Sequence, residues 1–499
     1  MASQSKTWGS FLIWLQENGL DHLELKLAWS AFEETGRGMK AVVEIKPGDN
    51  ILKIPSSLLI SWPVIVKRHN LEAIPYALKP SLPSHLLLTM YIITQLSLSE
   101  KSWCFPYIAT LPEAFPTLEL LYLNRSNCIS MLTSPAKEKV LIQQEKIKRE
   151  FQALKLFVQK YPQLLEKIGC KPPSQFTPDS FHIGGLCVTI ENFLWAWLVV
   201  NTRSIYLNDP KAPVNFAGLA PIALVPYLDL LNHLPQTKVV DVYDSKSGIF
   251  TFVSGQRYQP GEQVFITYGA HDNIALMIEY GFVIPTNPYD YACIDVHIWK
   301  YLLMEQAPVD NLDALLAERL SPLPIVKVLQ QNDLLRNLAI QSDGEPDFRL
   351  MNLLRLWHLP CYNLQTTKHA SDTPTTPKQR IQHPIRKGGH KIPTVTTLPE
   401  ETEEYWLDLW YSIWSGTSET FPEKHRTVEA AAYASLTGIL TAASTSTTQK
   451  LTQVQSRLSN GTLSLGESDL LHQLKAILDT ERSLLSKALI WTSQTHPNR

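Results

Sequence analysis

Apolar and polar positions follow two different periods along this chain of 499 residues. Short apolar runs separated by Gly, Pro and Asp occur at residues 33–61 and again at 223–266, and such runs are typical of strands joined by turns. Between these regions apolar residues recur every three or four positions, most clearly from Pro135 to Val158, as in an amphipathic helix. The pattern therefore predicts a β-rich domain that is split by a long helical insertion.

Turn residues divide the β-rich regions into individual strands. Lys46-Pro47-Gly48-Asp49 separates two apolar runs and is a typical turn sequence. We also expect Gly36-Arg37-Gly38 to form a hinge or turn, because glycine adopts backbone conformations that other residues avoid. The predicted strands cover residues 41–43, 51–55, 223–226, 239–243, 248–253 and 263–266.

Beyond residue 288 the apolar pattern is mainly helical. We expect short helices near residues 315–320, 334–335 and 350–356, and one long helix or a helix pair over residues 470–489. Residues 365–402 interrupt this pattern with Thr, Pro, Lys, Gly and His and contain almost no apolar side chains. Such a segment buries too little surface to offset its ordering entropy, so we predict a disordered insertion.

Composition narrows the class of protein. The 45 basic and 47 acidic residues give a net charge of −2, so no overall field favours nucleic acid or an anionic membrane, and we expect neither as a direct partner. No apolar run approaches the ~20 residues of a membrane helix, and no signal peptide is evident. We expect an intracellular protein, cytoplasmic or nuclear, with reduced cysteines. No metal site is expected, because no two cysteines have ligand spacing; they are Cys104, Cys128, Cys170, Cys187, Cys293 and Cys361.

Six short motifs occur in a fixed order and carry a family resemblance. They are Thr35-Gly36-Arg37-Gly38, Pro106-Tyr107, Asn201-Thr202-Arg203, Asp229-Leu230-Leu231-Asn232-His233, Phe265-Ile266-Thr267-Tyr268-Gly269 and Glu279-Tyr280-Gly281-Phe282. Together they resemble the SET domain of the Rubisco large-subunit methyltransferase-like class. The resemblance implies an α+β fold: a pseudoknotted, β-rich SET domain over residues 21–285, with its helical insertion at about 63–220, and an all-α substrate-binding domain over residues 286–499.

The same resemblance implies S-adenosylmethionine as the cofactor and a lysine of a protein substrate as the methyl acceptor. Small residues in the first motif would let the main chain approach the cofactor, and the Asn232 carboxamide suits its amino-acid end. Arg203 would contact the cofactor carboxylate, although a helix C-terminal charge is an alternative interpretation. The expected cofactor-binding residues are Thr35, Gly36, Arg37, Gly38, Thr202, Arg203, Asn232, His233 and Tyr268.

Tyr268 is the expected catalytic residue. Methyl transfer is an in-line displacement that depends on alignment, and a phenol hydroxyl can hold the polarised methyl group and orient the amine. The resemblance places Asp229, Tyr280 and Phe282 along the substrate channel, and a buried carboxylate at residue 229 needs a partner. Tyr107 is equally consistent with simple packing.

Two other functions remain open at this stage. Related proteins methylate a histidine ring, and the same channel could serve either nitrogen. A non-catalytic SET-like module that binds proteins is the alternative from another class. A monomer is favoured, whereas the substrate protein and the methylation state are left undetermined.

Overall fold

The computed structural model describes residues 2–20, 25–74, 81–125, 127–207, 220–244, 247–305, 309, 312–321, 323, 325–360, 403–415 and 426–495. The chain divides into two compact units. The first unit comprises Met1–Asn287 together with Thr462–Gln473, and the second comprises Pro288–Gly461 together with Leu474–Arg499. The division lies close to the predicted boundary at residue 285, but the first unit also takes a short piece from near the end of the chain.

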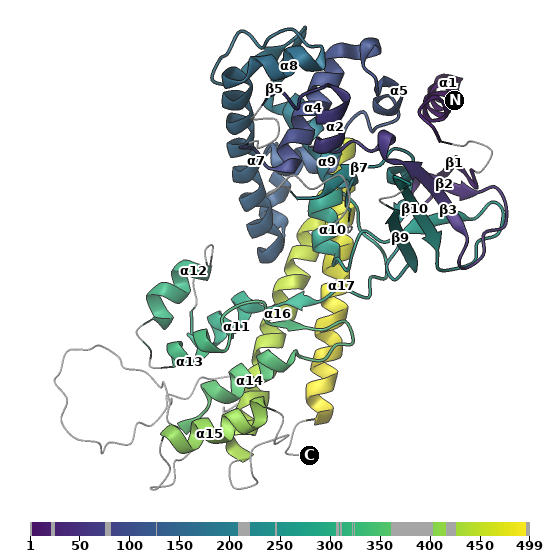
Figure 1. The fold of residues 1–499 in the computed structure, drawn as a ribbon. Helices are drawn as coiled ribbons and strands as arrows, with labels where there is room; N and C mark the ends of the chain where they lie inside the picture. Colours follow the sequence, from purple (N-terminus) through teal and green to yellow (C-terminus); the bar gives the residue numbers. More distant parts are fainter. Residues whose placement is uncertain are drawn as a thin grey trace. The chain divides into compact units, whose positions relative to one another are not determined.

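Two small sheets form the β-rich part of the first unit. The first has the order β1-β2-β11-β8 and the second the order β3-β10-β9; Figure 1 shows β1, β2, β3, β9 and β10 as neighbouring arrows. The strands are β1 (Leu27–Phe32), β2 (Gly36–Ala41), β3 (Asn50–Pro55), β8 (Asn232–His233), β9 (Val239–Asp244), β10 (Ile249–Ser254) and β11 (Gln263–Ile266). Sheet pairing therefore joins the two β-rich regions that the helical insertion separates in sequence.

Alternate positions along β10 and β11 are buried, as expected for strands that cover a core with one face. Phe250 and Phe252 point inward from β10, and Val264 and Ile266 point inward from β11. The predicted strand at residues 263–266 is confirmed with its exact bounds. Its start follows a turn at Gly261, which has a φ of +94°.

The prediction of a turn at Gly36-Arg37-Gly38 is wrong. These residues begin strand β2, which pairs with β1 so that Gly36 lies opposite Phe32, and the turn itself occupies residues 33–35. Residues 42 and 43 are likewise not in a strand. They follow the last β1–β2 pair in a bend, where their side chains are 44% and 46% exposed. Strand propensity alone could not show where the pairing partner ends.

Helices form most of the insertion between the two β-rich regions. In α7 (Ser134–Lys160) the inward positions include Val140, Ile147 and Leu154, which confirms the predicted amphipathic helix. α4 (Ser84–Leu98) is buried along most of its length and packs against α9 (Ile190–Arg203). The remaining elements of this unit are α1 (Ala2–Glu17), α2 (Trp62–Arg68), α5 (Phe105–Ile108), α6 (Pro116–Tyr122), α8 (Pro162–Ile168), α10 (Asn273–Tyr280), β4 (Ser180–Ile183), β5 (Leu186–Thr189), β6 (Ser204–Tyr206) and β7 (Ile222–Leu224).

The second unit is largely helical, so the α+β fold class is confirmed for the chain as a whole. Its elements are α11 (Asp295–Leu302), α12 (Leu312–Leu315), a π-helical turn (Leu316–Leu320), α13 (Val326–Gln331), α14 (Phe348–Trp357), α15 (Glu403–Trp414), α16 (Arg426–Asn460), most of α17 (Leu465–Thr495), β12 (Ala292–Cys293) and β13 (Ala339–Ile340). The predicted terminal helix is one continuous helix, α17. The predicted disordered insertion at residues 365–402 lies outside the described residues.

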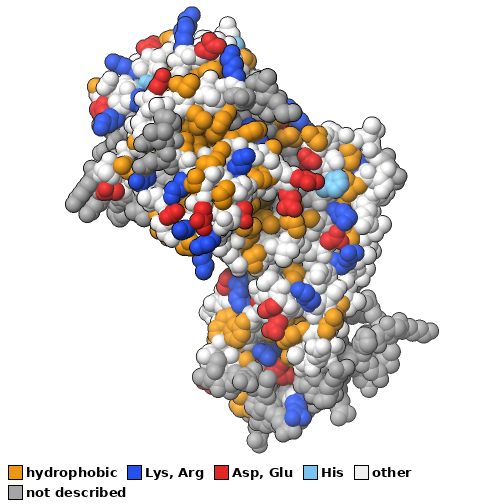
Figure 2. All heavy atoms as spheres, turned by 90° about the vertical axis from the view of Figure 1, so that its right-hand side faces the viewer, with side chains coloured by type: hydrophobic (Ala, Val, Ile, Leu, Met, Phe, Trp, Pro, Cys, Tyr) orange, Lys and Arg blue, Asp and Glu red, His pale blue; other side chains and the backbone are white. Residues whose placement is uncertain are grey.

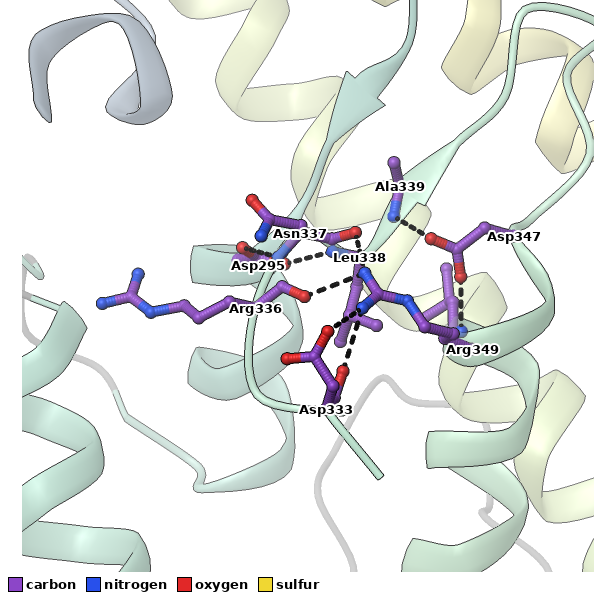
Figure 3. A network of polar contacts seen from close by, with 9 residues as sticks. Asp295, Asp333, Arg336, Asn337, Leu338, Ala339, Asp347 and Arg349 are labelled. Atoms are coloured by element: carbon purple, nitrogen blue, oxygen red, sulfur yellow. Dashed lines mark hydrogen bonds and ion pairs between the residues drawn. The ribbon is translucent and has the colours of Figure 1, made fainter. Parts of the chain in front are cut away.

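The predicted helix at residues 334–335 is absent, because this part of the chain forms a loop that charged side chains hold in place (Figure 3). Asp295 accepts hydrogen bonds from the main-chain N–H groups of Asn337 and Leu338, both at 2.8 Å. Arg349 donates to three main-chain carbonyls within residues 333–337, at 2.6 to 3.1 Å. These bonds satisfy backbone groups that a helix would otherwise pair internally.

Charge is dispersed over one face of the molecule. On the face drawn in Figure 2, Lys and Arg side chains are interspersed with Asp and Glu, and hydrophobic side chains gather between them. Within the part of the chain that the structure describes, no helix combines the length and the apolar character needed to cross a membrane.

Candidate active site

The parallel pairing of β8 and β11 brings two motifs together. Asn232 lies opposite Phe265 and His233 opposite Ile266, so the chain leaves β11 beside His233 and reaches Tyr268 two residues later. The Tyr268 main-chain N–H donates to His233 Nδ1 at 3.0 Å, and the two rings stack with centroids 5.1 Å apart. The Tyr268 hydroxyl donates to the Leu231 carbonyl at 2.9 Å. Three contacts thus hold Tyr268 against the motif that contains Leu231 and His233.

His233 acts through its side chain as well as its main chain. Burial lowers the pKa of His233 to about 4, which leaves the ring neutral near pH 7 and its Nδ1 free to accept from Tyr268. The sequence resemblance assigned this residue to the cofactor. The structure adds a positioning contact to Tyr268.

Asn232 joins β8 to the first motif. Its Nδ2 donates to the Arg37 carbonyl at 2.9 Å, and the backbone at Gly38 lies so close that a Cβ there would be 2.9 Å from Asn232 Nδ2 and 2.5 Å from Gln263 Nε2. Real Cβ atoms essentially never approach other atoms below 3.0 Å. A Cβ at residue 38 would therefore displace the Asn232 and Gln263 amides from their present positions, which supports the expectation that small residues permit a close approach.

A buried carboxylate lies beneath this corner of the site. The Tyr107 hydroxyl donates to Asp229 Oδ2 at 2.6 Å, and Arg203 donates from NH1 to the Asp229 carbonyl at 2.7 Å. The same NH1 is 3.6 Å from Asp229 Oδ2, and the Asp229 side chain is fully buried. Asp229 thus has the partners that a buried carboxylate needs, and Tyr107 is more than a packing residue.

Burial dominates the electrostatics of this group. It raises the pKa of Asp229, and the nearby Arg203 and the Tyr107 hydrogen bond counteract the rise. Burial also raises the pKa of Tyr107 and of Tyr268, so both phenols stay protonated at neutral pH. Among the described residues, Asp229 Oδ1 and Arg203 Nε are buried without a hydrogen-bond partner, so each keeps an unused hydrogen-bonding position.

Aromatic side chains form another wall of the site. Tyr280 ends helix α10, and Gly281 follows with a φ of +83°, which turns the chain so that Phe282 faces the same region. The Tyr268 ring centroid is 5.0 Å from that of Tyr280 and 6.4 Å from that of Phe282, the latter edge-on. Such a wall suits a substrate stem that is apolar and ends in a nitrogen.

These groups surround one cavity of about 470 Å³. Most of the predicted site residues line it: Arg37, Gly38, Thr202, Arg203, Asp229, Asn232, Tyr268, Tyr280 and Phe282. Thr35, Gly36 and His233 do not line it. The first two lie at an exposed strand connection, where the Thr35 hydroxyl donates to Gln263, and His233 lies in the layer behind Tyr268.

Several lining residues were missed by the sequence interpretation. They are Trp8, Trp29, Glu113, Asp469 and Gln473. None lies in a motif, and Gln473 follows its partner Gly281 by 192 positions, so no local pattern could have indicated it. No group of three or more His, Cys, Asp and Glu side chains suited to a metal ion is found among the described residues.

Comparison with known proteins identifies the class to which this fold and site belong. Residues 36–269 match the family model for the SET domain, so this part of the chain is similar to a SET domain. Human SET domain-containing protein 4 is 28% identical over 330 residues, which cover 66% of this chain and 68% of that protein. The mouse protein of the same name is 28% identical over 343 residues, covering 69% and 70%. Chicken actin-histidine N-methyltransferase is 26% identical over 289 residues, covering 58% and 44%.

Solved structures show the same fold. A crystal structure described as the SET domain of LSMT bound to lysine and AdoHcy aligns with a TM-score of 0.59 at 17% identity, covering 98% of this chain and 91% of the other. A structure of Rubisco LSMT bound to AdoMet aligns with a TM-score of 0.56 at 18% identity, covering 98% and 92%. The predicted SET fold is confirmed, whereas the threading of a pseudoknot stays a prediction.

Proposed function

We propose that this chain is a protein methyltransferase that transfers a methyl group from S-adenosylmethionine to the side-chain nitrogen of a lysine. The observation that carries the proposal is the single cavity in which Arg203, Asn232 and Tyr268 meet the aromatic wall of Tyr280 and Phe282. The match to the SET-domain family model and the structural neighbour bound to AdoMet support S-adenosylmethionine as the cofactor. The structural neighbour bound to lysine supports lysine as the methyl acceptor.

The residues present fit this cofactor. Its amino-acid end has one ammonium and one carboxylate, which are complementary to the unpartnered Asp229 Oδ1 and Arg203 Nε. Gly38 has no side chain of its own, so the Arg37 and Gly38 backbone lies at the cavity beside the Asn232 amide. We propose that Arg37, Gly38, Thr202, Arg203 and Asn232 hold the cofactor. When bound, S-adenosylmethionine supplies an electrophilic methyl group on a sulfonium.

The protein's part in the reaction is to position groups and exclude water. Because the Tyr268 hydroxyl donates a hydrogen bond to the Leu231 carbonyl, its oxygen lone pairs remain available as acceptors. The raised pKa of Tyr268 keeps the phenol neutral, so we assign it an orienting role rather than that of a base. The aromatic wall disfavours a charged ammonium by desolvation and so favours the neutral, nucleophilic amine.

Histidine is the second candidate acceptor. The relatives named actin-histidine N-methyltransferase are the observation that favours it. An aromatic wall of Tyr268, Tyr280 and Phe282 suits a flat imidazole as well as an aliphatic stem, so the choice between the two nitrogens is made by experiment.

The test has two stages. Calorimetry first measures binding of S-adenosylmethionine to the folded protein; absence of binding would support a non-catalytic module instead. A single-turnover assay then uses methyl-labelled cofactor with protein extract, followed by mass spectrometry of the labelled residue. Label on lysine supports the proposal, label on histidine supports the second candidate, and cofactor binding without transfer to any extract protein would contradict both.

A further inference from the structure

The start of helix α17 belongs to the unit that carries the candidate active site. Thr462–Gln473 groups with the first unit, whereas the rest of this helix groups with the second. Gly466 makes this contact close, because a Cβ at that position would lie 2.9 Å from Pro116 Cβ and 3.0 Å from a Leu120 methyl carbon in α6. A larger residue would push the helix start away. The chain therefore brings a distant segment to the cavity by a specific close contact.

Gln473 is the residue that this contact delivers to the cavity wall. Its Nε2 donates to the Gly281 carbonyl at 2.8 Å and lies 3.5 Å from the Thr117 hydroxyl. A carbonyl can only accept, so this bond identifies which end of the amide is the NH₂ group. The other end, Oε1, is buried and has no hydrogen-bond partner among the described residues. The cavity lining includes Gln473, while Oε1 itself is closed off from solvent, so a substrate N–H reaches it when the side chain turns toward the cavity.

Gln473 bonds to a residue between the two aromatic side chains of the expected substrate channel, and not to a residue of the cofactor-binding motifs. Its partner Gly281 lies between Tyr280 and Phe282, the aromatic wall next to Tyr268. Asp469, one helical turn earlier, lines the same cavity and carries two carboxyl oxygens. The start of α17 therefore offers hydrogen-bond acceptors to whatever enters along this wall, and the complementary group is an N–H donor.

We propose that Gln473 is a substrate-binding residue, whose Oε1 accepts a hydrogen bond from an N–H of the protein segment that carries the methylated residue. The inference rests on the proposed function and names a contact that the substrate makes outside the cofactor motifs. A buried amide oxygen without a partner costs free energy, and a substrate N–H removes this cost on binding. The start of α17 thereby contributes to substrate selection.

Two substitutions separate this contact from a purely structural role. Gln473→Met keeps the length of the side chain and removes both polar groups, whereas Gln473→Glu keeps an acceptor and loses the donor to Gly281. His472→Ala is the matched control, because His472 is exposed on the same helix and its hydrogen bonds within the described part of the chain are to Ser468. The probe is a pool of peptides with a central lysine or histidine and varied flanks, assayed with methyl-labelled S-adenosylmethionine.

Gln473→Met is expected to raise the KM for the peptides about 3- to 10-fold, the size of one lost hydrogen bond. Its kcat and its affinity for S-adenosylmethionine should stay within about twofold of wild type. Gln473→Glu should show a smaller rise in KM, and His472→Ala none. An unchanged KM in the Met variant would overturn the proposal. So would equal rises in the Met and Glu variants, since these would assign the effect to the bond with Gly281 alone.

The wild-type protein in the same assay keeps the two proposals apart. If it transfers no label to any peptide, the proposed function fails. Fluorescence anisotropy then measures peptide binding directly, and equal affinities of wild type and Gln473→Met would overturn the role of Gln473 independently of turnover.

Discussion

Replacing Tyr107 with Phe tests the electrostatics beneath the candidate site. The change removes the hydroxyl that donates to Asp229 Oδ2 at 2.6 Å and leaves the packing of the ring in place. Both side chains are fully buried, so no water is positioned to replace the lost donor. A hydrogen bond to a buried charged group is worth about 1.5–3 kcal/mol, and we expect a loss of this size above neutral pH.

The loss of stability in Tyr107→Phe should increase as the pH rises. Burial raises the pKa of Asp229 in the folded protein, and the Tyr107 hydrogen bond limits that rise. A raised carboxyl pKa favours folding below the ordinary aspartate pKa, and this contribution is lost as the pH rises through the folded value. Because Tyr107→Phe raises the folded pKa of Asp229 further, the cost of the substitution is largest at high pH. It should fall to about 1 kcal/mol where Asp229 is protonated in both proteins.

Calorimetric unfolding of both proteins from about pH 4 to about pH 8 measures this dependence. A unit of this size shifts its Tm by roughly 2 °C per kcal/mol, so we expect a decrease of about 3–6 °C at the upper end. Tyr227→Phe is the matched control, because this buried hydroxyl donates to the uncharged Leu27 carbonyl at 2.7 Å. Its cost should not vary with pH. A pH-independent cost for Tyr107→Phe would refute the reasoning.

Local patterns predicted the elements whose partners lie nearby. The α7 helix follows from its apolar period, and β11 follows from alternation after a Pro-Gly turn. The glycines at 36 and 38 were misplaced in a turn, because their strand conformation depends on pairing with β1 and on contact with Asn232. That contact joins residues almost 200 positions apart, and no short-range pattern records it.

The residues of the candidate site likewise divide into those that a local sequence pattern indicates and those that depend on a distant partner. The motifs indicated Tyr268 and Arg203, because their residue types recur in a recognisable order. Tyr107 was left undecided and Gln473 was missed, since each depends on one partner, 122 and 192 positions away respectively. A single tyrosine or glutamine without neighbours of fixed type carries no signal of its own. Only the fold shows which carbonyl or carboxylate it meets.

Three further substitutions test the site and the second unit. Tyr268→Phe should lower turnover about 100-fold while the affinity for S-adenosylmethionine, measured by calorimetry, changes little; wild-type turnover would contradict the orienting role. Gly38→Ala should weaken cofactor binding, because the new Cβ would lie 2.5 and 2.9 Å from two side-chain amide nitrogens, whereas Gly9→Ala has no atom within 4 Å and should leave binding unchanged. Arg355→Met should destabilise the second unit by about 3–5 kcal/mol, since it removes a guanidinium whose Nε lies 3.0 Å from the buried Glu429 carboxylate. Replacing Glu429 with Gln in the same protein should recover part of that loss, because no buried charge then remains; calorimetric unfolding that shows the double variant no more stable than Arg355→Met would contradict this account.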